Sequence, residues 1–478
     1  MTPGVFQTGD DLLRLIDSIT VKNGSKLKCY DFVESIVGFC NSDDQDGKIG
    51  IVFGLPLTGK TVGMVQAVEL LLQQGHRVAY VSLKFSELEA VDDVSAELIE
   101  LLDSGYTHFF VDEAPYLQKL LTESARLADA FPVKIVATGP DTFKLWYALN
   151  LALPDYSVGF STHCRSFLES KRVIGKGYGE YKAHSGLFIE GQSALGYLKS
   201  AIADNLIYSL QEGEDGSSED SKTDYVGEKQ SFYEATAVLL HSVSEVMLRK
   251  KFLQLTGLTS ETSHKGDYKA EYIAENPKSP IEGFMSFFIK VGCLLEIGIG
   301  TSDFDLQPSW CFAHPALLSY EVNDSMESIA RYEGVDARVI AKDVSKAAYW
   351  AINENIVLCH FLWFADKDEQ IFIYRDKEDR DIDIVSINRK LEKLRLVEVT
   401  GKSKDEVQRS AKVLFSKAIL KNIGVSDSFS ITRIIAYNGE NKCIEHAKGE
   451  LFLLKVEDLL CRIKDLDAFL SEIRSPYF

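Results

Sequence analysis

One short stretch constrains what this chain can fold into more than any other. It reads Gly54-Leu55-Pro56-Leu57-Thr58-Gly59-Lys60-Thr61 and fits the pattern G-x-x-x-x-G-K-[ST]. An apolar run, 49–53, precedes it, and a helix-compatible run, 62–73, follows it. This context predicts a strand, a phosphate-binding loop and a helix, in which backbone N–H groups and the positive helix end surround an anion. The chain is therefore predicted to bind a nucleoside triphosphate.

The residue types in this loop have separate expected roles. Gly54 and Gly59 let the backbone come close to the phosphates, and the whole run 54–61 is the candidate nucleotide site. Lys60 is expected to reach the β and γ phosphates, which makes it a candidate catalytic residue as well. The hydroxyl of Thr61 is expected to ligand Mg²⁺. The alternative is a chance glycine turn before a helix, which the flanking strand and helix disfavour.

Composition and charge exclude several classes of protein. The 478 residues suggest roughly three domains. A formal net charge of −19 argues against wholesale electrostatic binding to nucleic acid or to an anionic membrane, although a local basic patch stays open. The eight cysteines form no C-x-x-C motif, which disfavours a zinc site or a disulfide framework. The most apolar long stretch, 284–300, is interrupted by Lys290 and Glu296, so we expect a cytoplasmic protein without a membrane span.

A second motif follows about fifty residues after the loop. An apolar run, 108–111, ends in Asp112 and Glu113, which is the Walker B pattern that accompanies a phosphate-binding loop. Asp112 is expected to hold the Mg²⁺ that Thr61 also contacts, and Glu113 to polarise a water as a general base. The alternative is an acidic pair that caps a helix starting near Pro115. Both roles can hold together.

The surrounding pattern predicts an α/β fold with a parallel sheet. Further strands are expected at 77–83 and 133–137, with a helical segment at 91–102 between them. Strands that alternate with helices form parallel sheets covered on both faces. Ligands of such sheets bind at the carboxyl ends of the strands, where Gly54, Asp112 and Thr138 all fall.

This order of parts resembles the AAA-type P-loop ATPases, in the branch that has a Glu directly after the Walker B Asp. The resemblance gives Thr138 the position of a polar sensor residue that contacts nucleotide, with a simple turn residue as the alternative. It also implies an arginine finger, for which Arg126, Arg165 and Arg172 are candidates, although an arginine at any of these positions is more often an ordinary surface residue.

The middle of the chain is less informative. Residues 153–211 resemble the helical lid of one prokaryotic AAA family, through Tyr178-Gly179-Glu180-Tyr181 and the turn 185–190. Residues 212–228 hold seven acids against one lysine and read as a linker. Two helical runs, 232–255 and 280–291, precede an extended pair at 294–299 and 309–312, which suggests a winged-helix module. Without a basic stripe, packing is favoured over DNA binding for that module.

The last third of the chain carries a second acidic constellation. A helix, three strands and a further helix with Glu354, Asp383 and Glu398 resemble the restriction-endonuclease-like fold. Active members use such acids and a lysine to bind Mg²⁺ and orient water on a phosphodiester. Here Thr400 stands where that lysine belongs, and Lys402 lies two residues later. Either the lysine has migrated in a nuclease, or the acids are structural in an inactive remnant, which is favoured.

The full order of parts resembles prokaryotic AAA ATPases with a winged helix and a degenerate endonuclease-like C-terminal domain. The expected divisions are a helical preface, an ATPase core, a lid, an acidic linker, a winged helix and the C-terminal domain: 1–46, 47–152, 153–211, 212–230, 231–335 and 336–478. The resemblance implies an ATP- and Mg²⁺-dependent ATPase that switches a non-cleaving C-terminal module. An ATP-dependent nuclease or DNA-processing enzyme and a regulatory scaffold with little turnover are the alternatives. DNA, a protein partner and self-association are all left open.

Overall fold

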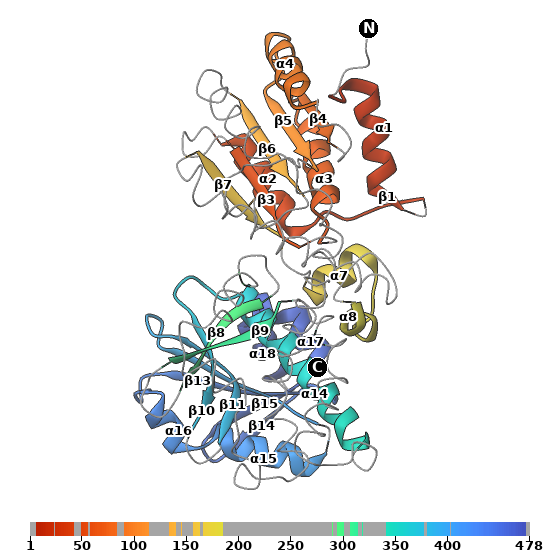
Figure 1. Cartoon of the computed structure of the whole chain (residues 1–478). Coiled ribbons are helices and arrows are strands. Elements are labelled where there is room, and N and C mark those ends of the chain that lie inside the picture. Colours follow the sequence, from red (N-terminus) through yellow and green to blue (C-terminus); the bar gives the residue numbers. More distant parts are fainter. Residues whose placement is uncertain are drawn as a thin grey trace, which may run out of the picture.

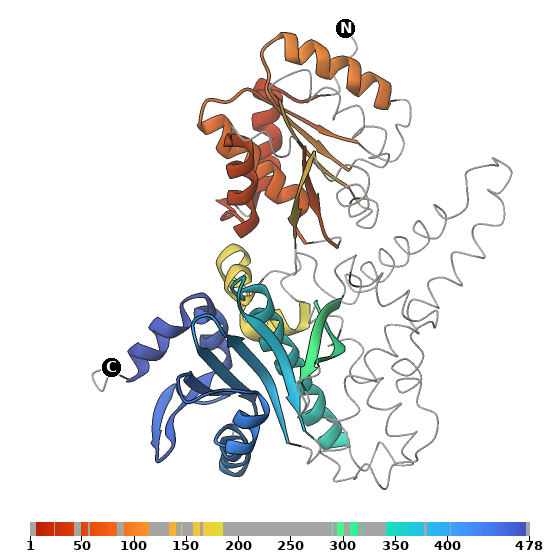
Figure 2. The ribbon, with the colours of Figure 1, turned by 90° about the vertical axis from the view of Figure 1, so that its left-hand side faces the viewer.

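The chain folds into two lobes, each built on its own β-sheet (Figures 1 and 2). The upper lobe holds a five-stranded parallel sheet, and the lower lobe holds an eight-stranded mixed sheet. The fold is therefore α/β, as predicted. The computed structural model describes residues 6–22, 24–42, 49–55, 58–83, 90–113, 133–139, 145, 156–162, 166–184, 289, 294–300, 306–313, 318, 341–376, 380–401 and 403–474. None of the helices in these ranges is both long and apolar enough to cross a membrane.

The parallel sheet has the order β4-β5-β6-β3-β7. Its strands are β3 (Ile49–Phe53), β4 (Val78–Ser82), β5 (His108–Asp112), β6 (Lys134–Thr138) and β7 (Ser157–Ser161). Helices α3 (Lys60–Gln73) and α4 (Ala90–Asp103) follow β3 and β4 in the chain. The first four strands confirm the sequence predictions, because their nearly continuous apolar residues are buried in the sheet. The strand β7 was not predicted and lies inside the segment that we expected to be a helical lid.

The N-terminal residues pack against this sheet as part of the same lobe. Two helices, α1 (Gly9–Thr20) and α2 (Asp31–Asn41), flank a small hairpin of β1 (Val21–Lys22) and β2 (Ser25–Lys26). The apolar faces of both helices pack into one core with α3, so the predicted N-terminal helical segment is part of the upper lobe. Residue Gln7 forms an antiparallel bridge with Tyr80 at the β4 edge.

The sheet of the lower lobe has the order β14-β15-β13-β12-β11-β10-β8-β9. Its strands are β8 (Leu294–Gly300), β9 (Leu306–Phe312), β10 (Gln370–Arg375), β11 (Asp381–Asn388), β12 (Lys393–Val399), β13 (Ser430–Tyr437), β14 (Lys442–His446) and β15 (Gly449–Lys455). The helices of this lobe are α14 (Ala341–Trp363), α15 (Lys404–Leu414), α16 (Lys417–Asn422), α17 (Val456–Arg462) and α18 (Leu466–Arg474), with a 3-10 turn, Ile463–Asp465, between the last two. The predicted long helix over 404–421 is two helices, because the chain turns at Phe415 and Ser416.

The hairpin that we assigned to a winged helix belongs to this sheet. Strands β8 and β9 pair antiparallel, as expected, but β8 also pairs in parallel with β10. The side-chain amide of Asn355 on α14 bonds both backbone groups of Phe312 at the end of β9. The expected boundary between residues 335 and 336 therefore separates two strands from the sheet that they complete. The acidic linker and the helical runs predicted at 232–255 and 280–291 lie outside the described residues.

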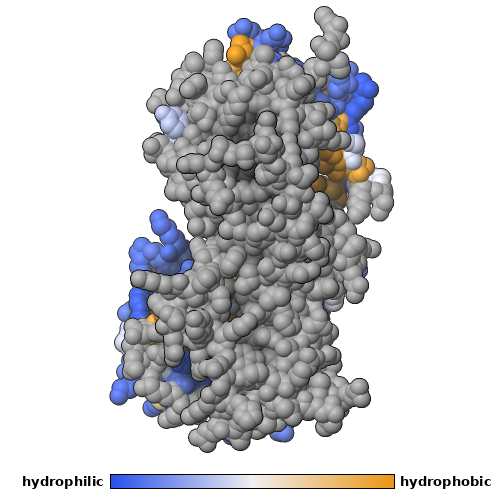
Figure 3. Space-filling view, in the orientation of Figure 1, coloured by the Kyte–Doolittle hydropathy of each residue, from blue (hydrophilic) through white to orange (hydrophobic). Residues whose placement is uncertain are grey.

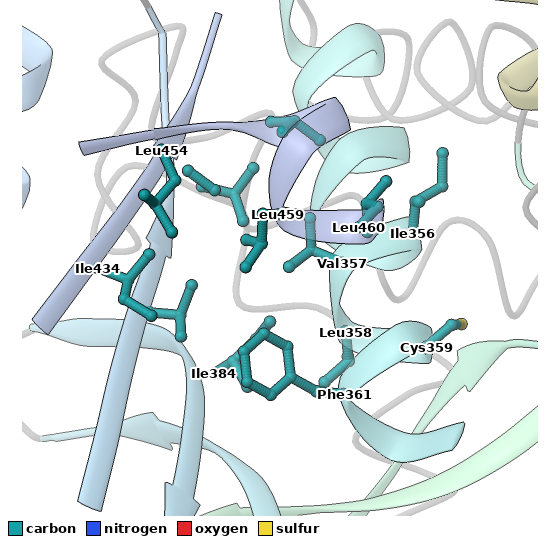
Figure 4. Close-up of a cluster of buried hydrophobic side chains, with 14 of the residues drawn as sticks. Ile356, Val357, Leu358, Cys359, Phe361, Ile384, Ile434, Leu454, Leu459 and Leu460 are labelled. Carbon is teal, nitrogen blue, oxygen red and sulfur yellow. The ribbon is translucent and has the colours of Figure 1, made fainter. Parts of the chain in front are cut away.

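Two short helices connect the lobes (Figure 1). Helix α7 (Phe167–Ile174) starts at Ser166, whose hydroxyl accepts a hydrogen bond from the N–H of Glu169, and ends at Gly175 with φ 71°. Helix α8 (Tyr178–His184) follows. Phe167 of α7 and Tyr178 and Tyr181 of α8 enter an apolar core of the lower lobe. Figure 4 shows the part of that core where α14, α17 and the sheet meet. The labelled members of that core include Ile356, Val357, Phe361, Ile384, Ile434, Leu454, Leu459 and Leu460.

Exposed apolar side chains are few and scattered in the described parts of the chain. Figure 3 shows small groups of hydrophobic atoms on the upper lobe among hydrophilic ones. The large apolar residues with high exposure lie on separate elements of both lobes: Leu13, Val21, Ile99, Tyr156, Leu306, Leu391 and Ile444. Single exposed apolar residues of this kind are normal on a protein surface.

Candidate nucleotide site

The loop after β3 is shaped by its two glycines. Gly54 has φ 151°, and a Cβ atom there would lie 2.3 Å from both the carbonyl oxygen and the hydroxyl of Thr162. Gly59 has φ 93° and occupies the position before the first turn of α3. A larger residue would be strained at either position, and at Gly54 it would also collide with Thr162, so both glycines have a steric reason for being there. Pro56 and Leu57 lie outside the described residues.

Lys60 is buried at the centre of this loop. Its ammonium donates hydrogen bonds to the carbonyl oxygens of Gly54 at 2.8 Å and Leu55 at 3.1 Å. Burial lowers the pKa of Lys60 to about 8, against the opposing charges of Asp112 and Glu113. A buried ammonium held only by carbonyl oxygens and nearby acids is a site that a phosphate oxygen would complete. Thr61 follows in the first turn of α3 and is partly buried.

Asp112 ends β5 and is almost fully buried. One carboxylate oxygen, Oδ2, accepts a hydrogen bond from the hydroxyl of Tyr80 at 2.8 Å. The other, Oδ1, accepts one from the backbone N–H of Glu113 at 2.9 Å. Sequence reasoning missed Tyr80, which lay inside an apolar strand pattern. The available signal was that a buried tyrosine hydroxyl usually finds a polar partner.

Glu113 leaves the strand in an unusual backbone conformation. Its φ is 55°, in the left-handed region that glutamate rarely adopts. The residue is exposed overall, but partial desolvation of its carboxylate, followed by the charge of Asp112, raises the pKa of Glu113, and Lys60 opposes this change. Strained backbone and a raised carboxylate pKa are both common where a side chain accepts protons. The arrangement suits the general-base role that the sequence suggested for this residue.

Two threonines border the loop from neighbouring strands. Thr138 lies at the end of β6, opposite Val52 of β3, and its hydroxyl donates to the Val52 carbonyl at 2.7 Å. That hydroxyl can still accept a hydrogen bond, as a sensor residue would. Thr162 lies just after β7, and its hydroxyl is 2.8 Å from the hydroxyl of Thr58. Thr162 was not predicted, because the strand that carries it was not.

The donor set fits a nucleotide with Mg²⁺ better than a metal held by protein alone. In the described parts of the chain, no three His, Cys, Asp or Glu side chains gather closely enough to hold a metal ion. Mg²⁺ usually takes one or two protein ligands and completes its shell with phosphate and water. Asp112 and Thr61 are the residues here that would hold it.

Of the three candidate arginine fingers, only Arg172 lies in the part of the chain that the structure describes. The guanidinium of Arg172, on α7, donates to the carbonyl oxygen of Cys29 at 2.9 Å and to the carboxylate of Asp31. These bonds attach α7 to the start of α2. The side chain of Arg172 is therefore engaged by residues of its own chain. Arg126 and Arg165 lie outside the described residues.

The acids of the lower lobe are brought together only in part. Asp383 on β11 and Glu398 on β12 lie just beyond the paired residues Ile384 and Val397. Asp383 accepts the N–H of Val399 at 2.7 Å, and Glu398 accepts the hydroxyl of Ser410 at 3.1 Å. Glu354 lies on α14 and is partly buried. Lys402, the candidate migrated lysine, lies outside the described residues.

Comparisons with known proteins give only distant likenesses. No family model and no curated protein matches the chain. Among solved structures, the Aeropyrum pernix Orc1 protein in complex with DNA is 13% identical over 69% of this chain and 100% of its own, with a TM-score of 0.25. AMPPCP-bound DnaA from Aquifex aeolicus is 15% identical over 54% and 76%, with a TM-score of 0.22. A DNA replication initiation factor is 12% identical over 68% and 92%, with a TM-score of 0.20. Overlaps this low assign no function to the chain.

Proposed function

We propose that this chain is a P-loop ATPase whose nucleotide state is communicated to its lower lobe. The observation that carries the proposal is the placement of three charged groups at the carboxyl edge of the parallel sheet. Lys60 is buried in the loop after β3, where it donates to the carbonyls of Gly54 and Leu55, and Asp112 and Glu113 leave the parallel strand β5 at the same edge. Phosphate-binding loops and acids of this kind act together in nucleotide hydrolysis.

The chain's own residues supply the binding and the proton transfer. The backbone of the loop 54–61 and the ammonium of Lys60 bind phosphate oxygens. Asp112 and Thr61 would hold Mg²⁺, which would neutralise charge on the phosphates. Glu113 orients a water molecule and takes its proton during attack on the terminal phosphate. A raised pKa makes the Glu113 carboxylate a better proton acceptor than an ordinary surface glutamate.

The lower lobe is the proposed receiver of this switching. Helices α7 and α8 come directly after β7, whose end contacts the phosphate-binding loop through Thr162. Phe167 of α7 and the tyrosines of α8 are buried in the core of the lower lobe, and Val173 of α7 is buried in the core of the upper lobe. A shift of the loop on nucleotide binding or release would therefore reach the lower lobe through a short segment of chain.

Phosphate release by the purified full chain tests this function. With ATP and Mg²⁺, the wild-type chain should release phosphate, and Lys60→Ala should reduce the rate by about 100-fold, since removing one positioned charged donor commonly costs that much. Lys26→Ala is the matched control, because Lys26 is an exposed residue of the same lobe that pairs with Glu69. Equal rates for the two variants, or no Mg²⁺-dependent release by the wild type, would contradict the proposal.

A nuclease activity of the lower lobe is the second candidate, favoured by the adjacent acids Asp383 and Glu398. Incubation of the chain with plasmid, ATP and Mg²⁺ or Mn²⁺ tests it directly. Cleavage that disappears in Asp383→Ala but persists in the exposed-residue variant Asp368→Ala would establish it. Intact plasmid under all these conditions would leave the lower lobe as a non-cleaving module.

A further inference from the structure

Tyr80 contacts the candidate metal-binding acid from a neighbouring strand. It lies on β4, next to β5, and its hydroxyl donates to Asp112 Oδ2 at 2.8 Å. The N–H of Glu113 occupies Asp112 Oδ1 at 2.9 Å. With one donor on each oxygen, the plane of the carboxylate is fixed, and so is the direction of its remaining lone pairs.

Tyr80 is itself held firmly. Its ring is almost completely buried in the core shared by α1, α2 and α3. Its backbone N–H donates to the carbonyl of Gln7 at 3.1 Å, and its carbonyl accepts the N–H of Gln7 at 2.6 Å. The buried ring and the paired backbone therefore hold the hydroxyl in place as the donor to Asp112 Oδ2.

We propose that Tyr80 is a positioning residue that orients Asp112 for a divalent cation. The inference rests on the proposed function and adds a residue outside the two nucleotide motifs. A donor behind a metal-binding carboxylate keeps it in one orientation, and loss of such outer partners typically weakens metal binding 10- to 100-fold. Without this hydroxyl, the buried carboxylate would lose one partner and turn toward another donor, such as the ammonium of Lys60.

The Mg²⁺ dependence of ATP affinity in the full chain tests this role. Tyr80→Phe keeps the ring and removes only the hydroxyl, and Tyr30→Phe is the matched control in the same buried core. In Tyr80→Phe, the Mg²⁺ concentration for half-maximal enhancement of ATP binding should rise by about 10-fold. ATP affinity in EDTA should stay within about twofold of the wild type, and excess Mg²⁺ should restore binding. In Tyr30→Phe the Mg²⁺ requirement should not change.

A double variant separates positioning from simple packing. If Tyr80 acts through Asp112, adding Tyr80→Phe to Asp112→Asn should leave the Mg²⁺ requirement of Asp112→Asn unchanged. A Mg²⁺ requirement equal in Tyr80→Phe and Tyr30→Phe would overturn the positioning role while the proposed function stands. A loss of metal-free ATP binding in Tyr80→Phe would show a structural role instead. A wild-type chain that binds no ATP would overturn both.

Discussion

Each lobe has a pair of acids near strand ends, but the two pairs differ in their surroundings and in their hydrogen-bond partners. Asp112 and Glu113 are consecutive residues that leave β5 at the edge where parallel strands end, and the charges of both act on the buried Lys60. Asp383 and Glu398 instead lie on β11 and β12, which pair antiparallel, and Glu398 also pairs in parallel with Ile435 of β13. There they accept hydrogen bonds from Val399 and Ser410. The acids of the upper lobe lie where parallel strands end, which is where ligands of such sheets bind. The acids of the lower lobe bond to a neighbouring strand and to α15.

The segment that joins the lobes shows a second difference. Toward the lower lobe, α7 and α8 make buried contacts: Phe167 donates its N–H to His360 Nε2 at 2.8 Å, and the Tyr178 hydroxyl donates to Asn353 at 2.6 Å. Toward the upper lobe, Arg172 and Lys464 both reach the partly exposed carboxylate of Asp31. Buried, satisfied contacts are harder to break than exposed ion pairs. Val173 of α7 is also buried in the core of the upper lobe. We therefore expect α8 to move with the lower lobe, while α7 links the cores of both lobes.

The largest expected effect contrasts the two acid pairs. Glu113→Gln removes the proposed proton acceptor and should lower the rate of ATP hydrolysis by about 100-fold or more while ATP still binds. Asp383→Asn, in the other lobe, should leave that rate within about twofold of the wild type, since distant sites act independently. Phosphate release and ATP binding measure the two effects. If Asp383→Asn slowed hydrolysis as much as Glu113→Gln, the two acid pairs would not be functionally distinct.

The next effect concerns the buried side of the junction. His360 Nδ1 lies 2.7 Å from the carbonyl of Ile356, its Nε2 accepts the Phe167 N–H, and burial lowers its pKa to about 4. Because this pKa lies below the unfolded value of about 6.5, unfolding takes up a proton as the pH falls. The stability from neutral His360 is full above pH 6.5 and is lost toward pH 4, by about 2 kcal/mol between pH 7.5 and pH 5.

Urea unfolding of wild type and His360→Gln at both pH values measures this loss. Trp350 and Trp363, in the same core, provide a fluorescence signal for the lower lobe. Glutamine keeps an acceptor for Phe167 but does not titrate, so the difference between the two proteins should shrink at pH 5. A pH-independent difference would mean that His360 does not titrate on unfolding in this range.

A smaller effect is expected at the edge of the glycine loop after β3. Thr162→Val keeps the shape of the side chain but removes the hydroxyl that meets Thr58. One lost hydrogen bond of about 1 kcal/mol should raise the Kd for ATP by about fivefold. Thr20→Val is the control, because the Thr20 hydroxyl is buried in the same lobe but bonds to Ile16 in α1. Equal Kd values in the two variants would show that the Thr162 contact does not support the loop.

The smallest effect concerns the exposed side of the junction. Arg172→Ala removes an ion pair whose two side chains are 38% and 42% exposed. Solvent screens such pairs, so the free energy of unfolding should fall by less than about 1 kcal/mol. Tyr178→Phe, which removes a buried hydrogen bond from the other side of the same segment, should cost more than Arg172→Ala. The reverse order in urea unfolding would contradict the proposed division of the junction.

Much of the upper lobe could be predicted because its signals are local. A glycine loop between an apolar strand and a helix, and acids at the end of a second strand, are short patterns, and the structure places Gly54, Lys60, Asp112 and Glu113 at one sheet edge. The short strand β7 gave no such pattern, because several of its residues are only partly buried and small. Its contact with the loop through Thr162 was therefore hidden from sequence reasoning.

By itself, the sequence determined the glycine loop between β3 and α3, the acids at the end of β5 and the α/β class, because backbone geometry and hydrophobic periodicity act over neighbouring residues. The tertiary structure alone decided that β8 and β9 complete the lower sheet. It also decided that α7 and α8 join the lower core and that Tyr80 holds Asp112. These contacts connect residues far apart in the chain, and their partners are selected by burial and hydrogen-bond satisfaction, which no local pattern encodes.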